Sequence, residues 1–478
     1  MYSIPLIAQR MGSLILTPIT TRCLTPADYG ILGLLEQIGF LLSALLGGNF
    51  SAALGYFYAE ANSREACRPV IGTAILGAGA VGIAAGLLCW PFAAPMSRLI
   101  FGSDMATGYL RLHFALFMPA FVMEALFCWL RVANRPGIYV AGSIFNLLVT
   151  IAGILTLVAA YRLRIWGVIW TSAAAIVLTS LVLIVYCFRL ERPTFERHLF
   201  VRMARFAAPI GLSWLAMFIV NFGDRFVLAH YRLFSDMGIY NLAYKFGMLF
   251  SAIYGNFANY WEAQVFQIMK RHDSGTVFQR LFTYVFVATS FCGLGLVVCA
   301  RPGLTLFVGP LFRRAAVLVP ILVAAYYLQA LSYFLRALFL AAGRPGYDAV
   351  CTWIGAAVCL AGYLILIPRY GVWGAAVATL ISFVSMAVIS VVWTYRLCHY
   401  RVEGRRIVKI VIALAAGLTP FALLPHGAIM GQIGAAALSI AVFPAALWLM
   451  RFPTRGEMEA VRSAVRRFAA RWRAVPQA

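Results

Sequence analysis

The sequence ANRPG at residues 133–137 recurs as AGRPG at residues 342–346, 209 residues later. Each copy lies in a short loop between two apolar segments. Other motifs recur at nearly the same offset: DYGI at 28–31 and DMGI at 236–239, GNF at 48–50 and 255–257, and WGV at 166–168 and WGA at 373–375. These matches predict an internal duplication. A duplicated helical membrane bundle is the plan of many transporters, in which the substrate passes between the repeats.

The two Arg-Pro-Gly loops have a predicted structural role. Proline interrupts a helix and glycine permits a tight turn. We therefore expect a short hinge in each loop, with its arginine marking the cytoplasmic side.

The composition excludes a soluble protein. The chain is 63% hydrophobic and only 12% charged, whereas soluble domains have about 25% charged residues. A hydrocarbon core of ~30 Å takes ~20 apolar residues per helix, and the apolar runs do not alternate as barrel strands do. We predict an all-α, polytopic membrane protein with about fourteen transmembrane helices. The predicted spans are 4–23, 31–58, 69–97, 108–130, 137–160, 166–188, 206–228, 238–266, 278–300, 315–340, 347–368, 372–397, 407–425 and 431–450.

The net charge of +23 serves mainly to orient the chain. The loops between the predicted spans are numbered in chain order. Of 39 Lys and Arg residues, 26 lie in or beside the even-numbered loops and the C-terminal tail, and 11 lie in the odd-numbered loops. Positive loops stay in the cytoplasm, so both termini are expected there. Anionic membrane lipids, rather than nucleic acid, are the expected partner of this charge.

The predicted organisation has four parts. Residues 1–195 and 196–400 form two six-helix bundles, and because six spans return the chain to its starting side, both have the same orientation. Residues 401–451 hold helices 13 and 14, outside the repeat. In the tail at 452–478, apolar residues at spacings of three and four among arginines predict a basic amphipathic helix on the inner leaflet. A surface that docks a partner is the alternative for this tail.

No catalytic or metal-binding group is evident. The ten cysteines form no CxxC pair and are interpreted as small apolar residues, and the six histidines form no ligand-spaced group. No nucleotide-binding glycine motif is present, so neither a cofactor nor ATP hydrolysis is expected. No cleavable signal peptide is evident. The first apolar segment starts almost at Met1, which leaves a start upstream of it open.

Charged residues inside predicted helices are the best candidates for a binding site. Burying one costs ~2.5–3.5 kcal/mol on insertion scales, so such residues normally face an interior or a watery cavity. Lys245 lies about two turns into its helix, too deep to reach the interface easily, and the repeat counterpart of Glu36 is about position 244. We expect the two to lie on opposite walls of one cavity. The alternatives are a structural pair, or local bonds to backbone carbonyls.

Further polar residues are candidates for the same cavity. Each also has a structural alternative. For Asp224 and Arg225 it is a neutralised pair, and for Glu124 a helix-end ion pair with Arg131. For Arg10 it is a marker of the cytoplasmic helix end, and for the two asparagines a bond to a neighbouring helix. These candidates are Asp224, Arg225, Glu124, Arg10, and the repeat-matched Asn49 and Asn256.

Several of these motifs resemble a known family. PITTRCLTPADYG at residues 18–30, and Asp224-Arg225 followed by GIYNLAYK at 238–245, are similar to the signatures of polysaccharide (O-antigen-type) flippases. These belong to the multidrug/oligosaccharidyl-lipid/polysaccharide exporter superfamily. The Arg-Pro-Gly and Trp-Gly motifs also fit, and the resemblance covers about residues 4–400.

The resemblance implies two bundles around a cavity that opens alternately to either side of a bacterial inner membrane. The implied substrate is an undecaprenyl-diphosphate-linked oligosaccharide for cell-surface polysaccharide such as O-antigen or exopolysaccharide, with transport driven by an ion gradient. A monomer is implied, with a polysaccharide polymerase or export machinery as possible partners. Glu36 and Glu124 make the charge of this cavity mixed.

Other functions stay open at this point. A cation-coupled multidrug exporter of the same superfamily would use an acidic site in the N-terminal half, where Glu36 and Glu124 are the candidates. A membrane polysaccharide polymerase or ligase would need a long loop outside the membrane, and no loop is long enough. A scaffold without transport activity is the remaining alternative.

Overall fold

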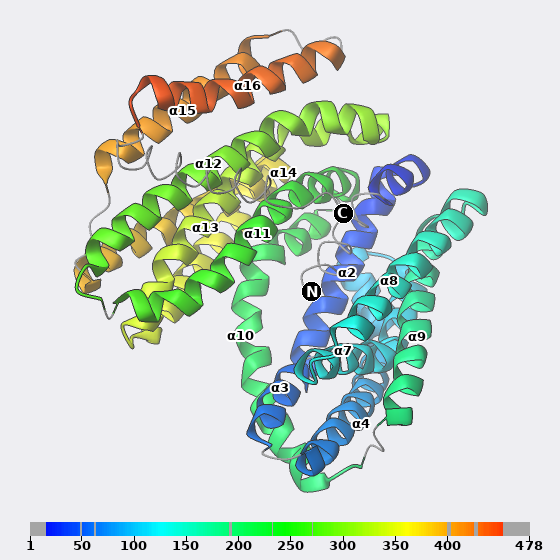
Figure 1. The fold of residues 1–478 in the computed structure, drawn as a ribbon. Coiled ribbons are helices and arrows are strands. Elements are labelled where there is room, and N and C mark those ends of the chain that lie inside the picture. Colours follow the sequence, from blue (N-terminus) through cyan, green and yellow to red (C-terminus); the bar gives the residue numbers. More distant parts are fainter. Residues whose placement is uncertain are drawn as a thin grey trace, which may run out of the picture. The chain divides into compact units, whose positions relative to one another are not determined.

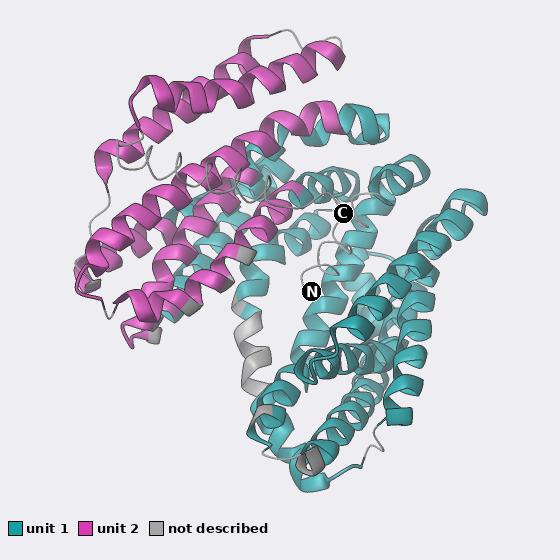
Figure 2. Ribbon diagram, in the orientation of Figure 1, with its two compact units in different colours: residues 1–245, 304–322, 349–385 teal, residues 246–303, 323–348, 386–478 magenta. Residues whose placement is uncertain are grey.

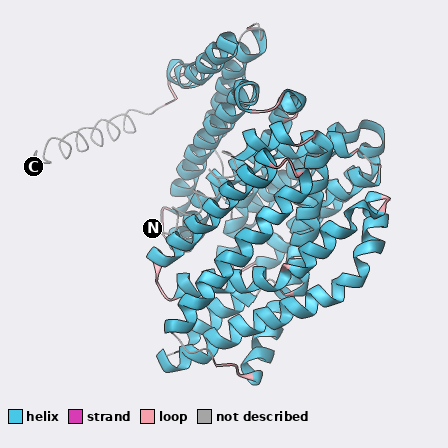
Figure 3. Cartoon of the chain, turned by 90° about the vertical axis from the view of Figure 1, so that its right-hand side faces the viewer, coloured by secondary structure: helices cyan, strands magenta, loops and turns pink. Residues whose placement is uncertain are grey.

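The computed structural model describes residues 16–47, 50–61, 64–190, 194–231, 233–269, 271–398, 403–424 and 429–452. In these ranges every regular element is a helix and there is no strand (Figure 3), so the predicted all-α fold is confirmed.

Residues 16–23 are helical. The labelled elements (Figure 1) are α2 (Pro26–Leu46), α3 (Phe50–Glu60), α4 (Arg64–Cys89), η1 (Trp90–Phe92), α5 (Ala93–Phe101), η2 (Asp104–Ala106), α6 (Thr107–Ala115), α7 (Phe117–Val132), α8 (Pro136–Gly153), η3 (Ile154–Ala160), α9 (Arg164–Leu190), α10 (Arg197–His230), α11 (Phe234–Met269), α12 (Ser274–Phe307), η4 (Pro310–Val317), α13 (Val319–Ala341), α14 (Pro345–Cys398), α15 (Gly404–Leu423) and α16 (Ile429–Leu449).

The helices are long and apolar enough for a multi-pass membrane protein. Among the described residues, nine helices could cross a membrane, and a bent pair, Asp104–Ala115 with Phe117–Val132, makes a tenth. One of the nine, Gly346–Leu397, is broken at Gly371, where φ is 54° and ψ is −130°, so it contains the predicted spans 347–368 and 372–397. Helices α10 and α11 cover the predicted spans 206–228 and 238–266. These extents are consistent with the predicted fourteen spans.

The two Arg-Pro-Gly loops end one helix and start the next in the same way. Asn134 and Gly343, two residues before each proline, have positive φ values of 52° and 70°, as in a glycine-type C-cap. Pro136 and Pro345 are the first residues of α8 and α14, where a missing N–H costs no helical bond. The glycine after each proline lies inside the new helix, so the expectation that it makes the turn is wrong. The loops close with matching N–H···O=C bonds, Arg135 to Leu130 at 2.9 Å and Arg344 to Phe339 at 2.8 Å.

Contacts divide the chain into two compact units (Figure 2). Unit 1 comprises residues 1–245, 304–322 and 349–385, and unit 2 comprises 246–303, 323–348 and 386–478. In unit 1, α4 packs on α7, α8 on α9, and α10 on α2, and in unit 2, α15 packs on α16. The two six-helix halves that the repeat suggests follow a different division and stay a prediction.

A close backbone contact in unit 1 sets the position of the candidate site. A Cβ at Gly238, near the start of α11, would overlap the carbonyl oxygen of Pro26 and lie 3.1 Å from the nitrogen of Gly30. A Cβ at Gly30, in α2, would overlap the carbonyl oxygen of Phe234. The two helices therefore touch backbone to backbone at two glycines that are 208 residues apart, close to the offset of the sequence repeat.

We expect Gly238→Ala to destabilise the protein. The added methyl group meets backbone rather than a movable side chain, so α2 and α11 must separate, and overpacking of this kind costs about 1–3 kcal/mol. Gly137→Ala is the matched control, because its added Cβ meets nothing within 4 Å and alanine favours a helix by roughly 0.5–1 kcal/mol. Thermal unfolding of the purified variants in detergent measures both. Equal melting temperatures for the two variants would contradict the close contact.

Candidate functional site

Lys245 and Glu36 lie about two turns beyond the glycine contact, on the neighbouring helices α11 and α2. Lys245 is half-buried, and its Nζ forms a long hydrogen bond of 3.4 Å to Thr17 Oγ1. It also lies 5.1 Å from the centre of the Tyr29 ring, within the range of a cation–π interaction. The charges of Lys245 and Glu36 interact. The structure therefore brings the two predicted residues together in unit 1.

The carboxylate of Glu36 is open to a ligand. Its side chain is exposed, and within the part of the chain that the structure describes no cation lies within 4.0 Å of it. The cations that act on it electrostatically are Lys245 and Arg225. Glu36 thus faces a positively charged environment without being closed into an ion pair.

Asp224 and Arg225 instead form a closed, buried pair. Their side chains are 0% and 4% exposed, and Arg225 NH1 lies 2.9 Å from Asp224 Oδ1. Tyr240 donates a hydrogen bond to the other carboxylate oxygen at 2.5 Å. The guanidinium also donates to Asn241 Oδ1 at 3.0 Å and lies 4.2 Å from the centre of the Tyr244 ring. The geometry favours the neutralised structural pair, which holds α10 to α11.

Asn241 connects this pair to the glycine contact. Its Oδ1 accepts the bond from Arg225, whereas its buried Nδ2 donates to no described residue. A Cβ at Gly33 would overlap this amide, so Gly33 provides the space that Asn241 occupies. The amide Nδ2 is thus a buried donor at the contact between α2 and α11.

Glu124 has a different set of partners in unit 1. Ser51, on α3, donates a hydrogen bond of 2.8 Å to Glu124 Oε1, on α7. Arg131 acts on the carboxylate electrostatically, as expected for residues two turns apart in one helix. Glu124 therefore has partners of its own, a hydroxyl and a nearby cation.

The remaining candidates cannot be placed. Arg10 and Asn49 lie outside the described residues, as does the tail 453–478 with its predicted amphipathic helix. Asn256 belongs to α11, but its side chain also lies outside the described set. Among the described residues no group of three His, Cys, Asp or Glu side chains could hold a metal ion, and nine cysteines there form no disulfide bond.

Thr17, Tyr29 and Asn241 were not selected from the sequence as site residues. For Asn241 the signal is the spacing of GIYNLAYK at 238–245, which puts Asn241 and Lys245 four residues apart on one helix face. Thr17 could not be found in this way, because 228 residues separate it from Lys245. Together these groups offer a cation, a carboxylate and neutral donors, which suit non-covalent binding of a charged, hydroxyl-rich solute.

Comparisons with known proteins agree with this picture. The family described as "Polysaccharide biosynthesis protein" matches residues 2–259. A structure of "Lipid II flippase MurJ, inward closed conformation" aligns with a TM-score of 0.75 at 15% identity, covering 94% of this chain and 98% of that one. An inward-facing multidrug resistance MATE family transporter of the MOP superfamily aligns with a TM-score of 0.65 at 14% identity, covering 84% and 98%. An outward-facing multidrug resistance MATE family transporter of the MOP superfamily aligns with a TM-score of 0.58 at 15% identity, covering 83% of this chain and 94% of that one. No curated protein matches the chain. At these identities the structural likeness concerns the fold alone.

Proposed function

Since the chain belongs to the polysaccharide biosynthesis protein family and has the fold of MOP-superfamily transporters, we propose that it is a flippase for an undecaprenyl-diphosphate-linked oligosaccharide. It moves this lipid from the cytoplasmic to the outer leaflet of a bacterial inner membrane by alternating access. The multi-pass membrane character and the transporter fold support this function. The cargo and the direction of transport are what we propose.

The observation that carries the proposal is the half-buried Lys245 beside an open Glu36. A diphosphate group needs a cation and hydrogen-bond donors, and the ammonium of Lys245 supplies a charge and three N–H donors. No described carboxylate lies within 4.0 Å of Lys245 Nζ, so its charge is not used up in a closed ion pair. Charged groups at this depth in a membrane protein mark substrate paths more often than scaffold.

Glu36 is proposed as the coupling residue. While it is ionised, its negative charge attracts Lys245 and repels a diphosphate. When it takes up a proton or a metal cation, that charge is neutralised and its repulsion of an anionic cargo beside Lys245 is removed. Loading of the cargo and uptake of the ion are then linked, so the rate of transport depends on the ion gradient and needs no nucleotide hydrolysis.

A second function is favoured by the same carboxylate. In a cation-coupled multidrug exporter, Glu36 would bind a cationic drug in exchange for a proton. Lys245 argues against this use, because a fixed ammonium group close to the carboxylate repels a cationic solute. The lysine therefore favours an anionic cargo.

Glu36→Gln tests the coupling proposal and separates the two functions. In cells that depend on this gene, deletion is expected to abolish surface polysaccharide and to accumulate lipid-linked oligosaccharide. The Glu36→Gln protein, neutral at every pH, is expected to transport slowly and to lose its response when the ion gradient is collapsed. Quantifying surface polysaccharide, with and without an ionophore, measures both effects.

Glu60→Gln is the matched control, because Glu60 is an exposed acid 3.6 Å from Arg202. It is expected to leave both readings unchanged. Normal polysaccharide together with increased sensitivity to cationic drugs in the deletion strain would contradict the flippase and support the exporter.

A further inference from the structure

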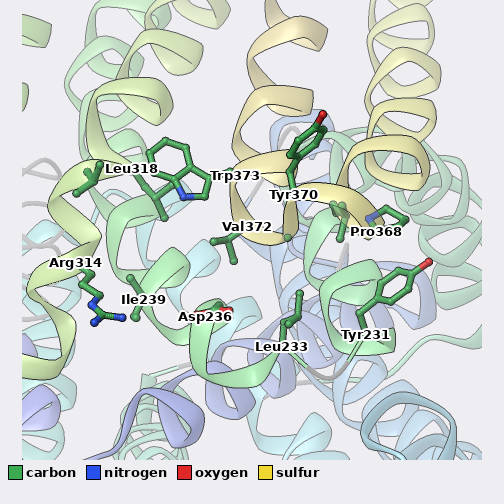
Figure 4. Close-up of a pocket in the computed structure, with 13 residues that line it drawn as sticks. Tyr231, Leu233, Asp236, Ile239, Arg314, Leu318, Pro368, Tyr370, Val372 and Trp373 are labelled. Carbon is green, nitrogen blue, oxygen red and sulfur yellow. The ribbon is translucent and has the colours of Figure 1, made fainter.

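A second polar site lies in unit 1, at the end where α10 stops and α11 starts. A pocket of about 650 Å³ is formed there by the α10–α11 turn, η4 and the break in α14 (Figure 4). Its walls are mostly apolar or aromatic and include Tyr231, Tyr370 and Trp373. One acid, Asp236, and one base, Arg314, also line it, and both side chains are exposed.

The corresponding place in the first half of the chain is occupied by an arginine. Arg164 donates to Asp28 Oδ2 with NH2 at 2.7 Å and with Nε at 3.1 Å. The 207-residue offset of the two Trp-Gly motifs takes Arg164 to Gly371, and the 208-residue offset of the Asp-x-Gly-Ile motifs takes Asp28 to Asp236. Arg164 and Gly371 have nearly the same unusual φ, 49° and 54°. The second half therefore keeps the acid and lacks the guanidinium.

The missing guanidinium leaves both space and an unpaired charge. An added Cβ at Gly371 would have only Leu233 within 4 Å among the described residues, at 3.5 Å, and the residue lines the pocket, so there is open space beside it. In the described part of the chain, no cationic side chain lies within 4.0 Å of the Asp236 carboxylate. No acidic side chain there lies within 4.0 Å of the Arg314 guanidinium. The pocket thus presents one negative and one positive group to a ligand that carries both opposite charges.

The rim of the pocket shows where such a ligand comes from. Tyr231, Tyr370 and Trp373 are 46%, 62% and 45% exposed. Exposed Trp and Tyr at the ends of membrane-spanning helices lie at the level of lipid headgroups. In the orientation that the positive loops predict, this end faces the outer leaflet.

We propose that this pocket binds the headgroup of a zwitterionic phospholipid with a primary ammonium group, phosphatidylethanolamine. The ammonium takes the place of the absent guanidinium and donates to Asp236, and the phosphate binds Arg314. The aromatic rim contacts the glycerol and the upper acyl chains. Phosphatidylcholine lacks N–H donors and phosphatidylglycerol lacks the cation, so neither satisfies Asp236. This site is independent of the cargo proposed above.

Native mass spectrometry of the purified full-length protein tests the site. The protein is incubated with equal amounts of phosphatidylethanolamine, phosphatidylcholine and phosphatidylglycerol, and retained lipid is measured. Wild type is expected to retain phosphatidylethanolamine preferentially. Asp236→Asn is expected to reduce this preference about tenfold, because it removes one charge-assisted hydrogen bond to the ammonium group. Arg314→Gln is expected to reduce phosphatidylethanolamine retention as well.

Asp104→Asn is the control, because Asp104 is an exposed acid paired with Arg98 at 2.8 Å, outside the pocket. It is expected to retain phosphatidylethanolamine like wild type, and unchanged melting temperatures show that all three variants are folded. Equal retention of phosphatidylethanolamine and phosphatidylcholine by wild type would overturn the proposal. So would binding of a glucosamine oligosaccharide that depends on Asp236 when phosphatidylethanolamine does not bind.

Discussion

Replacing Lys245 with alanine is expected to reduce transport of the lipid-linked oligosaccharide by roughly 10- to 100-fold. The ammonium is the charged donor proposed to hold the diphosphate, and hydrogen bonds to charged groups contribute about 1.5–3 kcal/mol, where 1.4 kcal/mol is about tenfold. Surface polysaccharide in cells that depend on the variant measures the loss. Membrane insertion is expected to remain intact, because the long hydrogen bond of Lys245 to Thr17 contributes little stability.

Two variants make this result specific. Lys245→Arg keeps a cation at the site and is expected to retain part of the activity, although its planar group donates in a different geometry. Lys409→Ala is the control, because Lys409 is also a half-buried lysine in a helix, with Nζ 2.8 Å from the Met450 carbonyl oxygen. It is expected to transport normally. Normal polysaccharide from a well-expressed Lys245→Ala protein would contradict a role for Lys245 in binding.

Replacing Arg225 with alanine is expected to cause a large loss of stability rather than a selective loss of transport. It leaves Asp224 fully buried without its cation and removes the donor to Asn241. Breaking a buried ion pair on one side costs about 3–5 kcal/mol. We expect a much lower melting temperature and a low yield of monodisperse protein after size-exclusion chromatography.

Two comparisons separate this effect from general sensitivity to mutation. Arg98→Ala breaks an ion pair of nearly the same length, 2.8 Å against 2.9 Å, whose side chains are 69% and 57% exposed, so it is expected to cost no more than ~1 kcal/mol. Changing Asp224 to Asn together with Arg225 to Gln removes both buried charges and is expected to recover part of the stability. A stable Arg225→Ala protein with lost transport would instead place the arginine in the binding site.

Features that depend on local sequence could be predicted. The apolar runs predicted the helices, and the interruption between the spans 347–368 and 372–397 falls at Gly371. The prolines of the repeated loops predicted helix boundaries, but the residue with positive φ lies two positions before each proline. In the first loop it is Asn134, a residue type that tolerates this conformation.

Features that depend on distant contacts could not be predicted. Asp28 and Arg164 are 136 residues apart, and no local pattern links them. The space for Asn241 comes from Gly33 on another helix. Lys245 and Glu36 could be selected because a charge inside an apolar span is unusual whatever its surroundings. Asp224–Arg225 was selected for the same reason, and only the buried hydrogen bonds show that the pair is closed.

The central claim is that this chain itself moves a lipid-linked oligosaccharide across a membrane. Proteoliposomes that contain the purified protein and a fluorescent undecaprenyl-diphosphate oligosaccharide test it directly, with a membrane-impermeant enzyme that modifies only the outer-leaflet sugar. With an imposed ion gradient, wild type is expected to expose the inner-leaflet sugar far faster than protein-free liposomes, and Lys245→Ala is expected to resemble protein-free liposomes. Exposure by wild type at the protein-free rate, under every ion gradient, would contradict the account.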